Sequence, residues 1–282
     1  MLSASNLQIR GEFWAFLALA RKGWRIDRRH PFFLTASLIG MLQWVLPIVL
    51  ATIALAGPDN AGLDNFSRLA GTDAYLAYSV IGATTFLWTS WLTAELANNL
   101  RFDRSLGTLP TIWATTTTRF VLIVGGAIGR TFTPSVMAVG TFSLAWALFR
   151  FPLEPSVGPA LALLVCSGMA TIAVALPWAA ILLRYREGYL VVQLFVMGAG
   201  ILAGIAYPVA VLPGWAQWLS ALLPPTWMIR GLRSALIFSD LRDVVLACAV
   251  LLAMALVYGA AGLVLLHIMD RAARAKGELE WM

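Results

Sequence analysis

Six long apolar runs constrain this chain more than any other feature of its sequence. A helix needs about 20 mostly apolar residues to cross a bilayer, and runs of that length stand at 32–56, 75–97, 120–149, 157–183, 189–209 and 244–268. Charged residues make up only 12% of the chain, against about 25% in a soluble domain, so the polar surface is too small to face water on every side. The sequence therefore predicts an all-α integral membrane protein with six transmembrane helices.

The basic residues predict how these helices are oriented. Cytoplasmic loops of membrane proteins carry an excess of Lys and Arg. With the N-terminus inside, 14 of the 20 basic residues fall on the cytoplasmic side and five on the other, while Arg130 lies within a span. We therefore expect both termini to be cytoplasmic. The net charge of +6 does not indicate nucleic-acid binding, because the cations stand in short clusters between apolar runs.

Residues 6–29 precede the first span and have an amphipathic pattern. Phe13, Phe16 and Trp24 fall on one helical face, with Arg and Lys side chains on the adjoining arc. This pattern is typical of a helix that lies in the membrane interface; a solvated basic tail is the alternative. The chain then divides into an N-terminal amphipathic interfacial helix (1–31), a transmembrane domain (32–270) and a cytoplasmic C-terminal tail (271–282).

The stretch between the second and third runs, 98–119, is too long for a simple turn and too polar to span. Leu109, Ile112 and Trp113 recur at helical spacing after a basic segment. A short amphipathic helix in the cytoplasm needs a cover for its apolar side, which either a partner protein or the lipid headgroups would supply.

The stretch between the fifth and sixth runs is apolar but broken by four prolines. Two short helices are expected, at 214–223 and 226–238, and neither reaches the length of a span. Backbone groups freed by proline cannot face lipid unpaired, so such segments must lie against protein or a water-filled cavity. We expect a re-entrant helical pair; an interfacial loop with Trp215, Trp218 and Trp227 as membrane-belt residues is the alternative.

Two of these stretches resemble motifs of the ABC-2-type permease family, the membrane subunit of many bacterial ABC exporters. The external motif is YPVAVLPGWAQWLSALLPPTWMIRGLR (207–233), and the internal one is RFDRSLGTLPTIWATTTTR (101–119). The resemblance covers essentially the whole chain. The family often has an acidic residue directly after Gly-Thr-Leu, where this chain has Pro110, so a contact made by that acid does not carry over.

The resemblance implies a location in the bacterial cytoplasmic (inner) membrane and a permease dimer. Each permease rests a cytoplasmic coupling helix, here about 102–117, in a groove of an ATP-binding cassette ATPase subunit present in two copies. ATP and Mg belong to that subunit, since the chain has no GxxxxGK[ST] loop of its own, and the chain is not an enzyme. The residues expected to couple to the ATPase are Arg101, Asp103, Arg104, Gly107, Leu109, Ile112 and Trp113.

The resemblance also implies that the second and fifth spans line the substrate route and that the re-entrant pair is the outer gate. The expected gate residues are Tyr207, Pro208, Pro213, Trp215, Pro224 and Pro225. Along the second span, Thr85, Thr89 and Thr93 share a face, which would either line the route or bond across helices. The remaining route candidates are Phe86 and Trp88 beside this stripe, with Gln193 and Met197 on the fifth span.

Glu95 and Arg130 are the ionisable residues that stand out within the spans. Charges inside a membrane are rare and tend to pair, so we expect a salt bridge that holds the second and third spans beside the coupling helix. The alternative is that Glu95 is interfacial and Arg130 snorkels to the headgroups. On the fifth span, Gly200 and Gly204 have a GxxxG spacing that favours close helix packing, including packing at a dimer interface.

These patterns predict a permease subunit of an ATP-driven exporter that moves an amphipathic, lipid-like or drug-like molecule outward. A polysaccharide exporter of the same family is the near alternative, and a stand-alone ion-coupled carrier or channel is the alternative from another class. A carrier would need ionisable residues deep in several spans. His30 and His267 have no cysteine or carboxylate cluster near them in the sequence, so neither a metal site nor a catalytic site is expected.

Overall fold

The computed structural model describes residues 11–19, 21, 25, 29, 31–57, 64–105, 119–154, 156–184 and 188–275, and every structural statement below concerns these residues. All regular elements in this part of the chain are helical. A 3₁₀ turn at Val209–Val211 precedes α9, and a π-helical turn at Ser234–Phe238 joins α10 to α11. The α-helices are α2 (Pro31–Ala56), α3 (Asp64–Ala70), α4 (Tyr75–Ser105), α6 (Arg119–Phe149), α7 (Val157–Arg184), α8 (Gly188–Leu202), α9 (Gly214–Ala221), α10 (Pro224–Arg233) and α11 (Leu241–Ala275).

Four helices in the described ranges are long and apolar enough to cross a membrane. The spanning segments are Thr35–Ala56 in α2, Val124–Phe149 in α6, Val157–Leu182 in α7 and Leu241–Met269 in α11. The chain is therefore a multi-pass membrane protein by length and composition. α4 has 31 residues, which at 1.5 Å per residue gives a length of about 46 Å. Its sequence is more polar than the sequences of the four spanning helices.

The expected fifth span ends early. It was predicted to run over 189–209, whereas α8 stops at Leu202 and has 15 residues. A helix of that length covers about 22 Å, short of a hydrocarbon core of about 30 Å. The chain leaves the helix at Gly204, whose φ of +69° is a conformation that glycine tolerates and other residues rarely adopt. The six-span count stays a prediction, with four spans supported.

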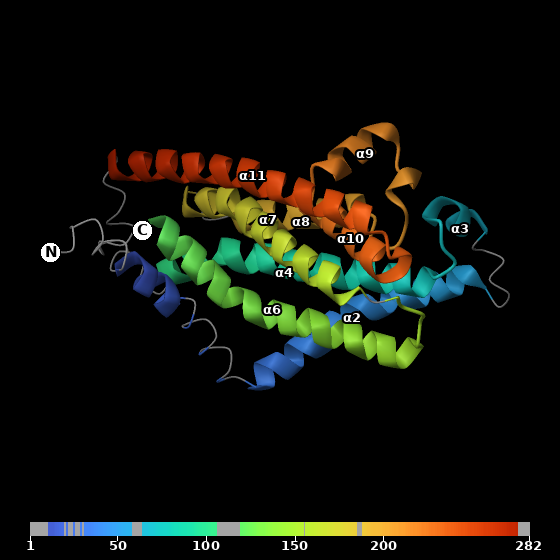
Figure 1. Ribbon diagram of the computed structural model, residues 1–282. Coiled ribbons are helices and arrows are strands. Elements are labelled where there is room, and N and C mark those ends of the chain that lie inside the picture. The colour runs from blue at the N-terminus through green and yellow to red at the C-terminus, as the bar shows by residue number, and fades with distance from the viewer. Residues whose placement is uncertain are drawn as a thin grey trace.

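The helices form an elongated bundle in which α4 is central (Figure 1). α7 and α11 pack along much of their lengths, while α2 and α6 pack on the other side of α4. α10 lies against α4, α7 and α11. The helical segment 11–19 and the end of α11 lie at one end of the bundle, and α3 lies at the other (Figure 1).

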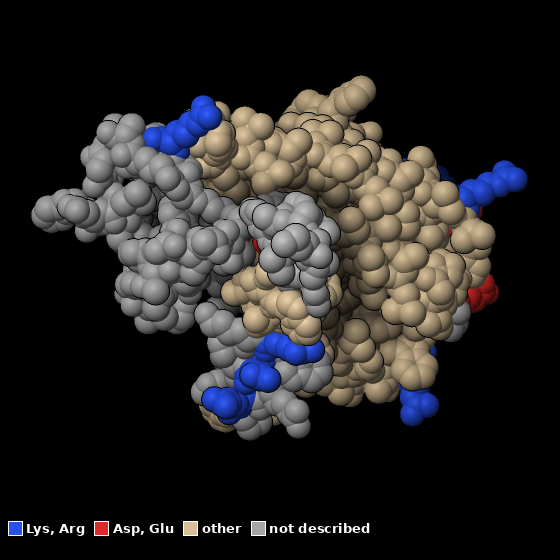
Figure 2. Space-filling view, turned by 60° about the vertical axis from the view of Figure 1, so that its left-hand side comes forward, with Lys and Arg blue, Asp and Glu red and all other residues tan. Residues whose placement is uncertain are grey.

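Two apolar clusters meet at α4 and bury it from both sides. One joins α4 to α7, α10 and α11 around Ile81, Leu163 and Met228, and the other joins it to α2 and α6 around Val45 and Val80. The outward faces of the peripheral helices are apolar and exposed, as a lipid-facing surface would be; Figure 2 shows charged side chains standing apart around a broad area of other residues.

The N-terminal segment is helical over residues 11–19, as its amphipathic pattern predicted. It lies against α6, where a Cβ on Gly125 would stand 3.3 Å from side-chain atoms of both Phe16 and Leu19. This close approach uses the absence of a side chain at Gly125 to seat the N-terminal helix on the bundle.

Candidate functional site

A narrow crevice lies between α4 and α8, with α7 and the start of α10 completing its walls. Its volume is about 30 Å³. We call it the α4–α8 crevice. It is lined by Phe86, Thr89, Ser90 and Thr93 of α4, Thr171 and Val174 of α7, Phe195, Val196 and Ala199 of α8, and Leu223, Pro224 and Pro225.

The threonine hydroxyls of this crevice are bonded to their own helices. Thr89 donates to the carbonyl oxygen of Phe86 at 2.9 Å, Thr93 donates to that of Thr89 at 2.8 Å, and Thr171 donates to that of Ser167 at 2.8 Å. Each of these threonine hydroxyls therefore donates its proton to the backbone of its own helix, so it does not offer that proton to a molecule in the crevice. No charged side chain of the described residues lines the crevice, so its surface is mostly carbon with a few hydrogen-bond acceptors.

The predicted route residues are divided between two hollows. Phe86, Thr89 and Thr93 line the α4–α8 crevice, whereas Thr85 and Trp88 line a separate cleft between α6 and α7. Met197, expected on the route, lies on the outward face of α8 with 69% of its surface exposed. Gln193 is partly buried on the same helix.

The GxxxG spacing of α8 serves packing within this chain at its first glycine. A Cβ on Gly200 would come within 2.9 Å of the Phe86 ring of α4. α8 therefore approaches α4 closely at the crevice wall, and Gly200 faces the ring of Phe86. Gly204 forms the turn that ends the helix.

The two short helices predicted at the outer gate are both present. Pro213 precedes α9 in an extended conformation, and Pro224 stands at the first position of α10, where a proline costs no hydrogen bond. These prolines begin helices, so they define the two pieces rather than disrupt them. Pro208 likewise precedes the 3₁₀ turn at Val209–Val211.

Side chains satisfy the backbone carbonyls at the helix ends of this region. The Tyr207 hydroxyl donates to the carbonyl oxygen of Ile201 at the end of α8. The Trp227 indole donates to that of Ala221 at 2.8 Å, and the Tyr258 hydroxyl donates to that of Leu222 at 2.8 Å. Carbonyls at helix ends have no partner within the helix, and at membrane depth they must find one in the protein. The arrangement meets that requirement.

α9 and α10 are buried to different extents. α10 buries Met228, Ile229 and Leu232 in the bundle, which agrees with a helix that enters the protein. α9 turns Trp215 and Trp218 outward, with Trp218 80% exposed, as membrane-belt residues would be. The segment predicted to be the outer gate thus consists of an embedded helix, α10, and a peripheral helix, α9.

Arg233, at the end of α10, is a buried cation that connects three segments. Its guanidinium donates to the carbonyl oxygen of Tyr78 from Nε at 3.2 Å and from Nη2 at 3.0 Å, and Nη2 also donates to that of Ile205 at 2.6 Å. Its Cζ lies 3.3 Å from the centroid of the Tyr78 ring, a cation–π contact. Arg233 thereby joins α10 to α4 and to the turn after α8.

The charge of Arg233 is balanced by dipoles and an aromatic face. No carboxylate of the described residues forms an ion pair with it. The residue is almost fully enclosed by protein, with 5% of its surface exposed. Gly82 provides the space for it, since a Cβ there would overlap both the Ile205 carbonyl and the Arg233 guanidinium.

Sequence reasoning missed this role of Arg233. The sequence pattern placed Arg233 within the external motif 207–233 without a role of its own. The available signal was an arginine within the otherwise apolar GLRSALIF (231–238), because an ionisable residue in a membrane segment is a functional candidate by default. Its partners, however, are the backbone carbonyls of Tyr78 and Ile205, 155 and 28 residues away in the chain, which no local pattern indicates.

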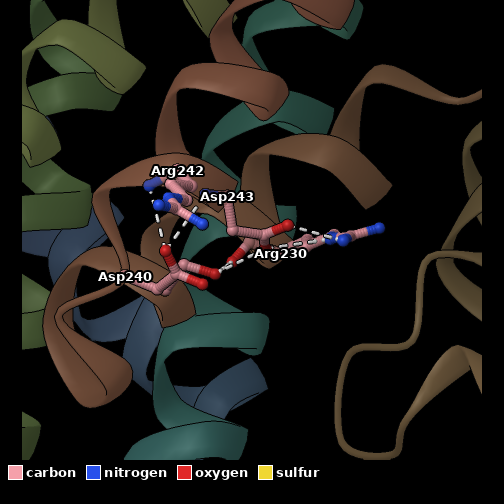
Figure 3. A network of polar contacts seen from close by, with 5 residues as sticks. Arg230, Asp240, Arg242 and Asp243 are labelled. Carbon is pink, nitrogen blue, oxygen red and sulfur yellow. Dashed lines mark hydrogen bonds and ion pairs between the residues drawn. The ribbon is translucent and has the colours of Figure 1, made fainter.

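A second polar cluster joins α10 to α11 near the surface (Figure 3). Arg230 donates from Nε to Asp243 Oδ2 at 3.0 Å and from Nη2 to Oδ1 at 2.5 Å, and the Ser234 hydroxyl donates to Oδ2 at 2.7 Å. The hydrogen bond with Asp243 raises the pKa of Arg230. Asp240 caps α11 by accepting the backbone N–H of Arg242 at 2.9 Å. The cluster fixes the angle at which α10 meets α11.

The remaining predicted residues fall largely outside the described side chains. Arg101, Asp103 and Arg104, expected to open a separate coupling helix, belong to the backbone of α4, which runs unbroken to Ser105. Gly107, Leu109, Ile112 and Trp113 lie outside the described residues. Glu95 is partly buried on α4, but the side chain of Arg130 is not described, so the salt bridge between them stays a prediction.

The comparison with known families points to one family. The model of the family described as "ABC-2 type transporter" matches residues 15–237. None of the curated proteins matches the chain. The matched range begins in the N-terminal helix and ends in the π-helical turn before α11, so it contains the α4–α8 crevice, the two short helices and Arg233.

Proposed function

The chain belongs to the ABC-2 type transporter family, and we propose that it is the membrane subunit of an ATP-driven exporter that moves an amphipathic, lipid-like or drug-like molecule outward. Membership makes it a permease of an ABC transporter, a transport component and not an enzyme in itself. The substrate class, the direction and the identity of the motor are the parts proposed here.

The α4–α8 crevice is the observation that carries the proposed substrate class. Most of its lining residues are aromatic, aliphatic or proline, and the threonine protons are taken by the backbone. A buried polar group without a partner costs about 1–3 kcal/mol, so a strongly hydrated substrate would lose more than these walls return. An apolar or amphipathic molecule loses little on entering, because the hydrophobic effect favours its burial.

The proposed motor is a separate ATP-binding cassette subunit in two copies, which holds ATP and Mg and pairs with two permease copies. The segment about 102–117 would rest on that subunit from the cytoplasmic side of a bacterial inner membrane, with both termini on the same side. The N-terminal helix and the end of α11 lie together at one end of the bundle (Figure 1), which supports this arrangement.

α4 is the element that would carry the motion. It extends unbroken from Tyr75 to Ser105, so Thr93 in the crevice and the start of the coupling segment at about 102 belong to one helix and lie about 14 Å apart along it. Closure of the ATPase dimer would move this rod relative to α8 and open the crevice outward. Because Arg233 attaches α10 to α4, the embedded gate helix would move with it.

A blocking variant tests the route. Thr89→Trp places an indole in the α4–α8 crevice, and Val257→Trp, on the exposed face of α11, is the matched control. With the ATPase subunit in membrane vesicles, we expect Thr89→Trp to abolish ATP-driven transport of a fluorescent short-chain phospholipid while the complex still assembles. Val257→Trp should transport as the unmodified chain does. Normal transport by an assembled Thr89→Trp complex would contradict the proposed route.

A further inference from the structure

A second hollow, larger than the α4–α8 crevice, lies between α6 and α7. Its volume is about 150 Å³. We call it the α6–α7 cleft. α6 and α7 each pack closely on α4 but barely touch one another, so the space between them has α4 as its floor. Its walls come from α6 and α7, and α10 and the π-helical turn close one end through Met228, Leu232 and Leu236.

Trp88 forms part of the floor and reaches both walls. Its indole N–H donates to Ser135 Oγ of α6 at 2.9 Å, and the far edge of its ring lies 3.8 Å from the position a Cβ would take on Gly168 of α7. Since its one polar group is occupied, the ring offers only carbon to the cleft. It is 5% exposed, so its position is fixed by packing.

The lining of the cleft leaves no place for water. Only two of its side chains are polar, Thr84 and Thr85, and the Thr84 hydroxyl donates to the carbonyl oxygen of Val80 at 2.7 Å. A buried water needs about two to four polar partners, whereas an apolar cavity of about 150 Å³ stays dry and accepts a benzene-sized ligand. The cleft therefore suits roughly six carbon atoms of an apolar molecule.

The cleft is continuous with the lipid-facing surface. α6 and α7 both contain segments long and apolar enough to span a membrane, so the gap between them opens toward hydrocarbon. Val139 belongs to the cleft wall and is itself 59% exposed, and exposed Leu161 and Val165 continue the apolar surface along α7. The molecules that reach this opening in a bilayer are lipid acyl chains.

We propose that the α6–α7 cleft binds one acyl chain of a bilayer lipid, at a site separate from the substrate crevice. Filling the hollow restores the dispersion contacts that its lining lacks, and it seats a lipid against Met228 and Leu232 of the gate helix. The site needs no particular headgroup and does not depend on which molecule the protein transports. The site also gives a role to Thr85 and Trp88, which line this cleft and do not line the α4–α8 crevice.

Photo-crosslinking in proteoliposomes tests the site. The unmodified chain is reconstituted in phosphatidylethanolamine containing a trace of the same lipid with a diazirine near the end of one acyl chain, then irradiated and analysed by peptide mass spectrometry. Met228 and Leu251 are equally inaccessible in the folded protein, at 1% and 0% exposure, but only Met228 lines the cleft. We expect labelling at Met228 and Trp88 and none above background at Leu251. Labelling confined to outward residues such as Val257 would overturn the proposal.

A filled-cleft variant provides the second readout. Ala138→Leu with Ala160→Leu adds apolar carbon to both walls, and we expect it to reduce labelling at Met228 to the level of Leu251 while Val257 is labelled as before. Undiminished labelling at Met228 would contradict the site. The wild-type pattern requires no variant, so the proposal remains testable if the double variant fails to fold.

Discussion

Replacing Arg233 by methionine is the perturbation whose consequence follows most directly from the geometry. Arg233→Met keeps the length and apolar stem of the side chain but removes the guanidinium that donates to the carbonyl oxygens of Tyr78 and Ile205. Hydrogen bonds to a charged group contribute about 1.5–3 kcal/mol each, and the cation–π contact with Tyr78 adds about 0.5–2 kcal/mol. The membrane-embedded denatured chain finds other partners, which lowers these values.

We therefore expect Arg233→Met to reduce the free energy of unfolding by about 3–5 kcal/mol. For a chain of this size that is a fall of roughly 6–20 °C in the apparent melting temperature. Arg233→Lys should fall between the two, because an ammonium lacks the planar fork that reaches both carbonyls. The matched control is Arg242→Met, since Arg242 is exposed and such substitutions usually change stability by less than about 0.5 kcal/mol.

The assay is thermal unfolding of the detergent-purified chain, followed by the fraction that stays monodisperse on gel filtration. Equal melting temperatures for Arg233→Met and Arg242→Met would refute the reasoning that the buried guanidinium holds α10 to α4. A large loss in both variants would show that positive charge near the α10–α11 junction matters more than these specific hydrogen bonds.

Two further experiments test neighbouring contacts. Gly82→Ala should prevent the chain from folding, because its Cβ would overlap the Ile205 carbonyl and Arg233. The control, Gly198→Ala on α8, meets open space and should stabilise the helix by about 0.5–1 kcal/mol. Equal yields of the two folded variants on gel filtration would show that the space at Gly82 is not required. In the Arg230–Asp243 pair the arginine side chain is 52% exposed and the aspartate 19%, so a thermal double-mutant cycle with Arg230→Gln and Asp243→Asn should give a coupling energy of only about 0.5–1 kcal/mol. A coupling several times larger would contradict the view that this pair contributes little to holding α10 in place.

The helix boundaries were largely predictable because local chemistry sets them. The run predicted at 157–183 corresponds to α7 at Val157–Arg184, and the run at 32–56 to α2 at Pro31–Ala56. Apolar length and the charged or proline-rich residues at the ends determine both. The same reasoning located two short helices after α8, since prolines favour helix starts over helix interiors.

The parts that could not be predicted depend on contacts between distant segments. α8 ends at Leu202 although the apolar run continues, because Gly204 turns the chain toward the Arg233 socket beside Gly82. The threonine face of α4 reads as one stripe in the sequence, but α6 and α8 approach it from different sides, so Thr85 and Thr89 serve different hollows. A periodic pattern shows which residues share a face, not which neighbouring helices divide that face.

The most direct test of the central claim, that this permease is driven by another polypeptide, compares transport by the purified chain alone with transport by the chain co-reconstituted with its ATP-binding subunit. The proteoliposomes are supplied with Mg and ATP on the side where the ATP-binding subunit is bound. We predict that a fluorescent phospholipid moves only when both subunits and nucleotide are present. Movement of the probe by the chain alone at the same rate, without nucleotide, would contradict it.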